Sequence, residues 1–182
     1  AWGAARLADA TPADVPGIRL RLVQPNIAQD LKWAEAERER ILGRLLALSA
    51  APAADGAAPT HIVWPESAVP YLLAEAPAIR AAVARIIPPR GALLTGAVRR
   101  TVAPDGGPGL LNSLVALDES GEITAAYDKI QLVPFGEYQP FRGLLAGLPK
   151  LTVGTVDFIP GAPLEATLTT AEQSMDGRRV TI

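Results

Sequence analysis

The chain has 182 residues, of which 49% are hydrophobic and 20% charged, and its formal net charge is −2. The apolar fraction is too high for a disordered chain, and the length is that of one domain with a sizeable core. Domains that bind nucleic acid are usually basic, so this charge argues against a nucleic-acid partner. The longest stretch without Asp, Glu, Lys or Arg, residues 106–117, is much too short for a membrane-spanning helix of about 20 apolar residues.

The chain contains no cysteine and only one histidine, His61. Disulfides, thiolate metal sites and a cysteine nucleophile are therefore excluded within these residues. A single histidine also argues against a Ser-His-Asp triad and against a histidine-based zinc site, and we expect His61 to be structural. Carboxylates, lysines and backbone donors remain as the groups available for chemistry.

The predicted elements begin after residues 1–17, a segment rich in Ala, Pro and Asp that we expect to be a linker. Its first residues lack the basic start and apolar run of a signal peptide, so we expect a cut end of a longer chain. Alternating or continuous apolar runs then predict strands at residues 18–23, 61–64 and 92–98. Apolar residues at helical spacing predict helices at residues 34–48 and 78–87. A Pro/Gly loop over 99–109 precedes two apolar runs, 110–117 and 123–127, which predict a hairpin.

The segment 128–141 is irregular and combines charged and aromatic residues, a composition typical of functional loops. Beyond it we predict a short helix at 142–148, a strand at 164–170, a turn at 176–177 and the start of a strand at 179–182. This order predicts an α/β fold, in which helices cover the outer face of a sheet and long loops lie at one end.

Glu66 is the first candidate for chemistry because it follows the predicted strand 61–64, between Trp64 with Pro65 and Pro70. We expect partial desolvation there, which raises the pKa of a glutamate toward the range of a general base. The alternative is an ordinary helix N-terminus, where a glutamate is stabilised by the helix dipole and Ser67 contributes to capping. Composition alone favours that alternative.

Lys129 and Glu137 are the second candidate. A lysine beside Asp128 is ordinarily part of a surface ion pair. In one cleft with Glu66, however, Lys129 would be a fixed positive charge for an oxyanion, and Glu137 could orient it. The third candidate is the segment 24–33, which ends in Trp33 and whose plainest interpretation is a loop from strand to helix.

Several of these motifs occur together in a known superfamily. Glu66 after an apolar strand, followed by Lys129 within Tyr127-Asp128-Lys129-Ile130-Gln131-Leu132, resembles the nitrilase (carbon–nitrogen hydrolase) superfamily. The runs 22–27 with 31–33, 64–70, 94–96 and 132–138 are similar, in this order, to those of the apolipoprotein N-acyltransferase family. The resemblance extends from about residue 18 to residue 182 and defines one nitrilase-like domain.

The resemblance implies an α/β/β/α sandwich, carried by membrane helices on the periplasmic side of the bacterial inner membrane. Enzymes of this family transfer an acyl chain from a phospholipid to the N-terminal diacylglyceryl-cysteine of an apolipoprotein, by a ping-pong mechanism through a cysteine thioester. By position, the resemblance implies that Glu66 is the general base, Lys129 stabilises the oxyanion and Glu137 is an additional essential glutamate. It also implies that Trp33 lies near the lipid entrance and that Asn112 lines the substrate pocket. No metal or organic cofactor is implied, because base, nucleophile and oxyanion donor are all protein groups.

Two positions depart from the family pattern. Gln131 stands where the family usually has histidine, which concerns a local hydrogen bond and not the reaction class. The nucleophilic cysteine is absent; in the family it follows a strand similar to residues 179–182. We therefore expect the domain to be incomplete at its C-terminus and inactive as it stands. Two alternatives remain open, a soluble nitrilase-type amidase that hydrolyses a small amide and a non-catalytic interaction module with a nitrilase-like fold.

Overall fold

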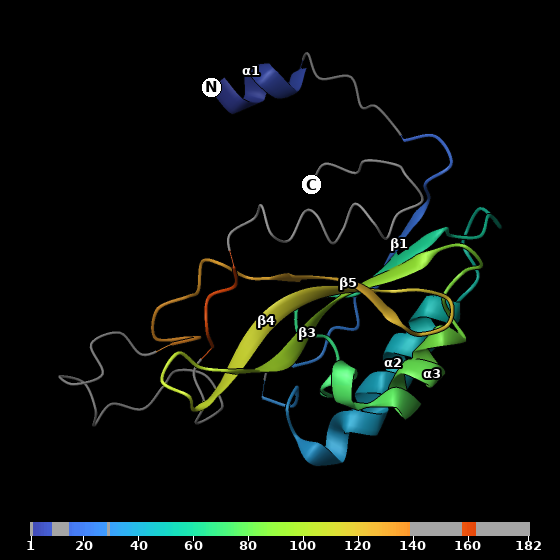
Figure 1. Cartoon of the computed structure of the whole chain (residues 1–182). Coiled ribbons are helices and arrows are strands. Elements are labelled where there is room, and N and C mark those ends of the chain that lie inside the picture. The colour runs from blue at the N-terminus through green and yellow to red at the C-terminus, as the bar shows by residue number, and fades with distance from the viewer. Residues whose placement is uncertain (1, 9–14, 29, 139–157, 163–182) are drawn as a thin grey trace.

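The computed structural model describes residues 2–8, 15–28, 30–138 and 158–162 (Figure 1). Its centre is a five-stranded sheet in which spatial order follows chain order. The strands are β1 (Leu20–Leu22), β2 (His61–Val63), β3 (Ala92–Val102), β4 (Pro108–Leu117) and β5 (Ile123–Asp128). Strands β1, β2 and β3 are parallel, whereas β3, β4 and β5 form an antiparallel meander. Parallel neighbours require long crossover connections, and these contain the helices.

Two helices lie against one face of this sheet, as Figure 1 shows. They are α2 (Arg38–Ala50), preceded by the 3-10 turn η1 (Glu35–Glu37), and α3 (Pro77–Ala84), preceded by the 3-10 turn η2 (Leu73–Glu75). Each helix turns an apolar stripe toward the strands, so that Ile41, Leu45 and Val83 are fully buried with Ile62 and Leu93 of the sheet. The α/β class and the predicted order of elements are thereby confirmed.

The other face of the sheet also carries apolar side chains. Successive side chains of a strand point to opposite faces, and Val115 of β4 belongs to the helix-covered core. Its neighbour Leu114 therefore points to the opposite face, as do Leu20 and Leu22 of β1, which are 54% and 74% exposed. The described residues thus form one helical layer on one sheet.

Strand β3 is longer than its sequence pattern predicts. The residues 99–102, predicted to begin a Pro/Gly loop, instead pair with residues 108–111 of β4. Their charges are accommodated at the sheet surface, because Arg99 pairs with Asp128 at 2.8 Å and Arg100 with Glu75 at 3.3 Å. Cross-strand pairing has here outweighed a local composition that favours a loop.

One further helix lies near the N-terminus. Helix α1 (Trp2–Ala8) lies within the segment expected to be a linker, and Trp2 is 76% exposed. The elements predicted at 142–148, 164–170, 176–177 and 179–182 lie outside the described residues. Within the described ranges, no helix has the length and apolar character needed to span a membrane.

Candidate active site

The position of Glu66 follows from how β2 ends. Beyond Val63 the Trp64 N–H donates to Leu94 O at 2.9 Å, so the chain stays against β3 for one more residue. The Trp64 indole is buried and donates to Ser49 Oγ at 2.8 Å, which fixes the ring against α2. After Pro65 the chain turns sharply, and Ser67 adopts a left-handed backbone with φ of 47°.

Gly96 of β3 makes this turn possible. Its N–H donates to Pro65 O at 3.3 Å, and its carbonyl accepts from the Ala68 N–H at 3.3 Å. A Cβ placed on Gly96 would lie only 2.5 Å from Glu66 Cα and from Ser67 N. The backbone of Glu66 therefore crosses β3 in direct contact, where only a glycine fits.

Four side chains from separate parts of the chain meet at this point. Asn112, in the middle of β4, donates its amide to Glu66 Oε1 at 2.6 Å and to Glu137 Oε1 at 2.7 Å. Lys129, directly after β5, places Nζ 3.5 Å from the same oxygen of Glu66 and 3.1 Å from the same oxygen of Glu137. One oxygen of each carboxylate is thus shared between an amide and an ammonium group. We call Glu66, Asn112, Lys129 and Glu137 the carboxylate–lysine cluster.

Main-chain hydrogen bonds fix the positions of Lys129 and Glu137. The Lys129 N–H donates to Asn112 O at 2.8 Å, and the Gly161 N–H donates to Lys129 O at 3.0 Å. The other oxygen of Glu137, Oε2, accepts from the Val133 N–H at 2.7 Å. Lys129 is therefore fixed through its main-chain N–H and carbonyl, and Glu137 is fixed through both carboxylate oxygens.

The two glutamates differ in environment. The Glu137 side chain is 13% exposed. Burial by itself would raise the pKa of this carboxyl group. The pKa is nevertheless lowered, by hydrogen bonds from the Val133 N–H, the Asn112 amide and Lys129 and by the lysine charge. Burial likewise opposes the charge of Lys129, yet the hydrogen bond to Glu137 and both carboxylate charges raise the pKa of that lysine above its ordinary value. At neutral pH the structure therefore holds Glu137 as an anion and Lys129 as a cation.

Glu66, in contrast, has a side chain that is 64% exposed. The prediction that Trp64 and the prolines desolvate it is wrong, because Trp64 turns its ring into the core and leaves the carboxylate at the surface. Among the described residues, both the Asn112 amide and the Lys129 ammonium donate to Oε1 of Glu66, and none donates to Oε2. Glu66 is thus the more exposed of the two carboxylates, beside a cation that can stabilise a developing negative charge.

The remaining predicted site residue, Trp33, is half-buried and does not bond to the cluster within the described part of the chain. Its neighbour Lys32 does reach it: Lys32 Nζ donates to the main-chain carbonyl of Glu66 at 2.9 Å. Sequence reasoning missed this contact, although Lys32 stood in a motif already singled out. His61, predicted to be structural, contacts Thr60 Oγ1 at 2.9 Å.

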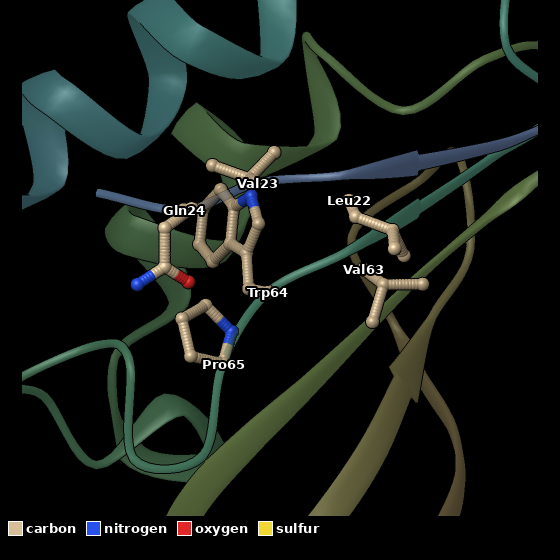
Figure 2. A pocket seen from close by; sticks show the side chains of 6 residues that line it. All are labelled: Leu22, Val23, Gln24, Val63, Trp64 and Pro65. Atoms are coloured by element: carbon tan, nitrogen blue, oxygen red, sulfur yellow. The ribbon is translucent and has the colours of Figure 1, made fainter. Parts of the chain in front are cut away.

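A small hollow of about 190 Å³ lies at the carboxyl ends of β1 and β2 (Figure 2). Its lining is mainly apolar and comprises Leu22, Val23, Gln24, Val63, Trp64 and Pro65. Within the described ranges, no group of three or more His, Asp or Glu side chains is placed to hold a metal ion.

Comparison with known proteins adds independent findings. The family model for carbon–nitrogen hydrolases matches residues 19–157. An apolipoprotein N-acyltransferase of Brucella suis is 44% identical over 133 residues, which are 72% of this chain and 25% of that protein. The apolipoprotein N-acyltransferase of Bradyrhizobium diazoefficiens is 37% identical over 180 residues, 89% of this chain and 34% of the relative. The chain thus spans about a quarter to a third of the length of these curated relatives.

Among solved structures, an amidase from Nesterenkonia sp. is 22% identical, with a TM-score of 0.43 over 80% of this chain and 49% of the amidase. A carbon–nitrogen hydrolase from Helicobacter pylori is 17% identical, with a TM-score of 0.37 over 64% of this chain and 40% of that enzyme.

Proposed function

The chain belongs to the carbon–nitrogen hydrolase family, and we propose that it forms the catalytic domain of an apolipoprotein N-acyltransferase. The acyl donor is a phospholipid and the acceptor is the N-terminal amine of a diacylglyceryl-cysteine on an apolipoprotein. The domain works at the periplasmic side of a bacterial inner membrane. Relatives named apolipoprotein N-acyltransferase, at 37% to 44% identity, support the proposal. The observation that carries it is the carboxylate–lysine cluster, in which one lysine lies within 3.5 Å of two carboxylates.

In the first half-reaction, Oε2 of Glu66 takes the proton of a cysteine thiol. The thiolate attacks the ester carbonyl of the phospholipid, and a carbon–sulfur bond forms as the carbonyl oxygen becomes an oxyanion. The Lys129 ammonium stabilises that oxyanion, because it is held by Glu137, which the Asn112 amide fixes in turn, and need not reorganise. The intermediate collapses to a thioester, and Glu66 returns its proton to the departing lysophospholipid oxygen.

In the second half-reaction, the apolipoprotein amine attacks the thioester carbonyl. Glu66 accepts the amine proton, and Lys129 again stabilises the oxyanion. The carbon–sulfur bond then breaks, and Glu66 gives its proton to the departing sulfur, which leaves an amide and the regenerated thiol. Trp33 and Asn112 are proposed to lie along the path of the acyl chain, Trp33 near its entrance. Glu137 keeps Lys129 in place, since both of its oxygens are engaged and its lowered pKa keeps it charged.

The proposed nucleophile is a cysteine, and these 182 residues contain none. The proposal therefore requires a cysteine from elsewhere in the gene product. Sequencing the reading frame on both sides tests this requirement. A frame without a cysteine downstream would favour the non-catalytic interaction module instead.

The chemical test measures acyl-thioester formation in the full-length gene product, incubated with phospholipid vesicles. Loss of the base in Glu66→Gln is expected to slow the reaction by roughly 10²- to 10⁴-fold, and loss of the oxyanion donor in Lys129→Ala by about 10²-fold or more. Glu39→Gln, on the exposed surface of α2, is the matched control and should react normally. A normal thioester yield in both site variants refutes the mechanism. Hydrolysis of small amides without acyl transfer to a lipopeptide would identify the soluble amidase.

A further inference from the structure

Lys32 is the one lysine in the described part of the chain that stands outside the carboxylate–lysine cluster, and its placement is unusual. Lysine side chains ordinarily extend into water. This one is half-buried and gives its ammonium to a main-chain carbonyl 34 residues away, at 2.9 Å. Burial lowers the pKa of Lys32, and the charge of Glu66 opposes that shift. An ammonium group that gives up solvation needs compensating contacts, so the contact with Glu66 is specific.

The carbonyl that Lys32 holds belongs to Glu66, at a constrained point of the backbone. Ser67, directly after it, has a left-handed φ of 47°, which costs a non-glycine residue conformational energy. Gly96 fixes the chain from the side of β3 through bonds to Pro65 and Ala68, on either side of this pair. These contacts leave the Glu66 carbonyl itself to Lys32. Among the described residues, Lys32 is thus the group that holds the peptide between Glu66 and Ser67 through its carbonyl.

We propose that Lys32 is a positioning residue, which fixes the peptide between Glu66 and Ser67 and so holds the carboxylate of Glu66 toward Lys129. This inference rests on the proposed function, in which Glu66 is the base. Because Lys32 also precedes Trp33 in the chain, the same bond joins the loop after β1 to the base. Placement of the loop and orientation of Glu66 are therefore coupled through one contact.

Loss of the Lys32 contact is expected to affect the rate of the chemical step more than the affinity for substrate. Without the ammonium, the peptide after Glu66 can rotate, and Ser67 can relax from its left-handed conformation. The carboxylate would then spend less time in the geometry set by Asn112 and Lys129. Misplacement of a reacting group by about 1 Å can slow catalysis by up to roughly 10²-fold.

The test compares Lys32→Met, Lys32→Arg and Lys32→Gln in the full-length gene product, with Arg44→Met as the matched control. Arg44 is an exposed cation of α2, so its removal changes the net charge by the same amount. We expect Lys32→Met to lower kcat for thioester formation about tenfold or more, with KM for phospholipid within about twofold. Lys32→Arg should recover most of the rate, because arginine donates to the same carbonyl. Arg44→Met should react as the unchanged protein does.

Wild-type kcat in Lys32→Met overturns the proposal, as does a rise in KM with kcat unchanged. If Lys32→Met does not fold, the other two variants decide: a rate kept by arginine and lost by glutamine supports the proposal, and equal rates overturn it. Failure of the proposed function is distinguishable, because Glu66→Gln would then react normally as well. A slow Glu66→Gln beside a fully active Lys32→Met removes only the role of Lys32.

Discussion

Substitution of Gly96 by alanine is the sharpest test of how the site is built. Gly96 is a residue of β3 and takes no part in the proposed chemistry. Its only special feature is the absence of a Cβ where the chain of Glu66 crosses the strand. A single methyl group at this position therefore perturbs the base without altering any charge.

The size of the effect follows from the distances. The added Cβ would lie 2.5 Å from Glu66 Cα and 2.9 Å from Glu66 C, whereas carbon atoms in contact prefer about 3.5–4.0 Å. Backbone atoms cannot rotate away as a side chain can, so Glu66 must move by about 1 Å. Overpacking of this kind costs about 1–3 kcal/mol of unfolding free energy. A displacement of about 1 Å at the base should lower the rate of thioester formation by up to roughly 10²-fold.

Two assays on Gly96→Ala check these values, urea unfolding and single-turnover thioester formation in the full-length gene product. Gly43→Ala is the matched control, since nothing lies within 4 Å of a Cβ at that position in α2. Alanine should stabilise that helix by about 0.5–1 kcal/mol and leave the rate unchanged. If Gly96→Ala matched the unchanged protein in both stability and rate, the close crossing of Glu66 over β3 would be refuted.

Two further substitutions test the supports of the site. Ser49→Ala should lower the free energy of unfolding in urea by about 1–3 kcal/mol, because the buried Trp64 indole loses its hydrogen-bond acceptor. Ser120→Ala, in the exposed turn before β5, is the control and should lower it by less. Glu137→Gln should destabilise the protein at neutral pH but not in acid. A carboxyl group whose pKa is lowered by folding contributes stability above its ordinary value of 4.5 and loses that contribution as pH falls through the folded value. Unfolding curves from pH 3 to 8 check this, and a difference between the two proteins that grows toward low pH would contradict the assigned direction.

The parts of the fold that were predictable are those encoded by local patterns. The apolar run at 61–64 and the helical spacing within 34–48 gave β2 and α2 to within a few residues, because periodicity reports which face is buried. The turn-rich residues 118–122 between two apolar runs predicted the hairpin of β4 and β5. Residues 99–102 of β3 were not predicted to be a strand, since Arg99 and Arg100 do not fit an apolar strand pattern. They belong to β3 because they pair with β4. Such pairing depends on residues distant in sequence.

The candidate site also has a part that the sequence predicted and a part that it did not. Family motifs identified the residues of the carboxylate–lysine cluster, which the structure brings together. Their environments were less predictable: the exposure of Glu66 depends on where the Trp64 ring turns, and that is decided by Ser49 on α2. The contact of Lys32 with Glu66 joins two loops, whose paths no periodic pattern encodes.

The sharing of two oxygens by one lysine has a consequence for the timing of charge. Nζ of Lys129 lies 3.5 Å from Oε1 of Glu66 and 3.1 Å from Oε1 of Glu137, so one ammonium group faces two carboxylates. In the proposed mechanism Glu66 takes up a proton, which leaves Glu137 as the anionic partner of Lys129 within the cluster. The lysine is then less compensated at the moment when an oxyanion needs it. In that mechanism the base and the oxyanion stabiliser are linked electrostatically, because proton transfer to Glu66 would increase the positive field that Lys129 offers to the substrate.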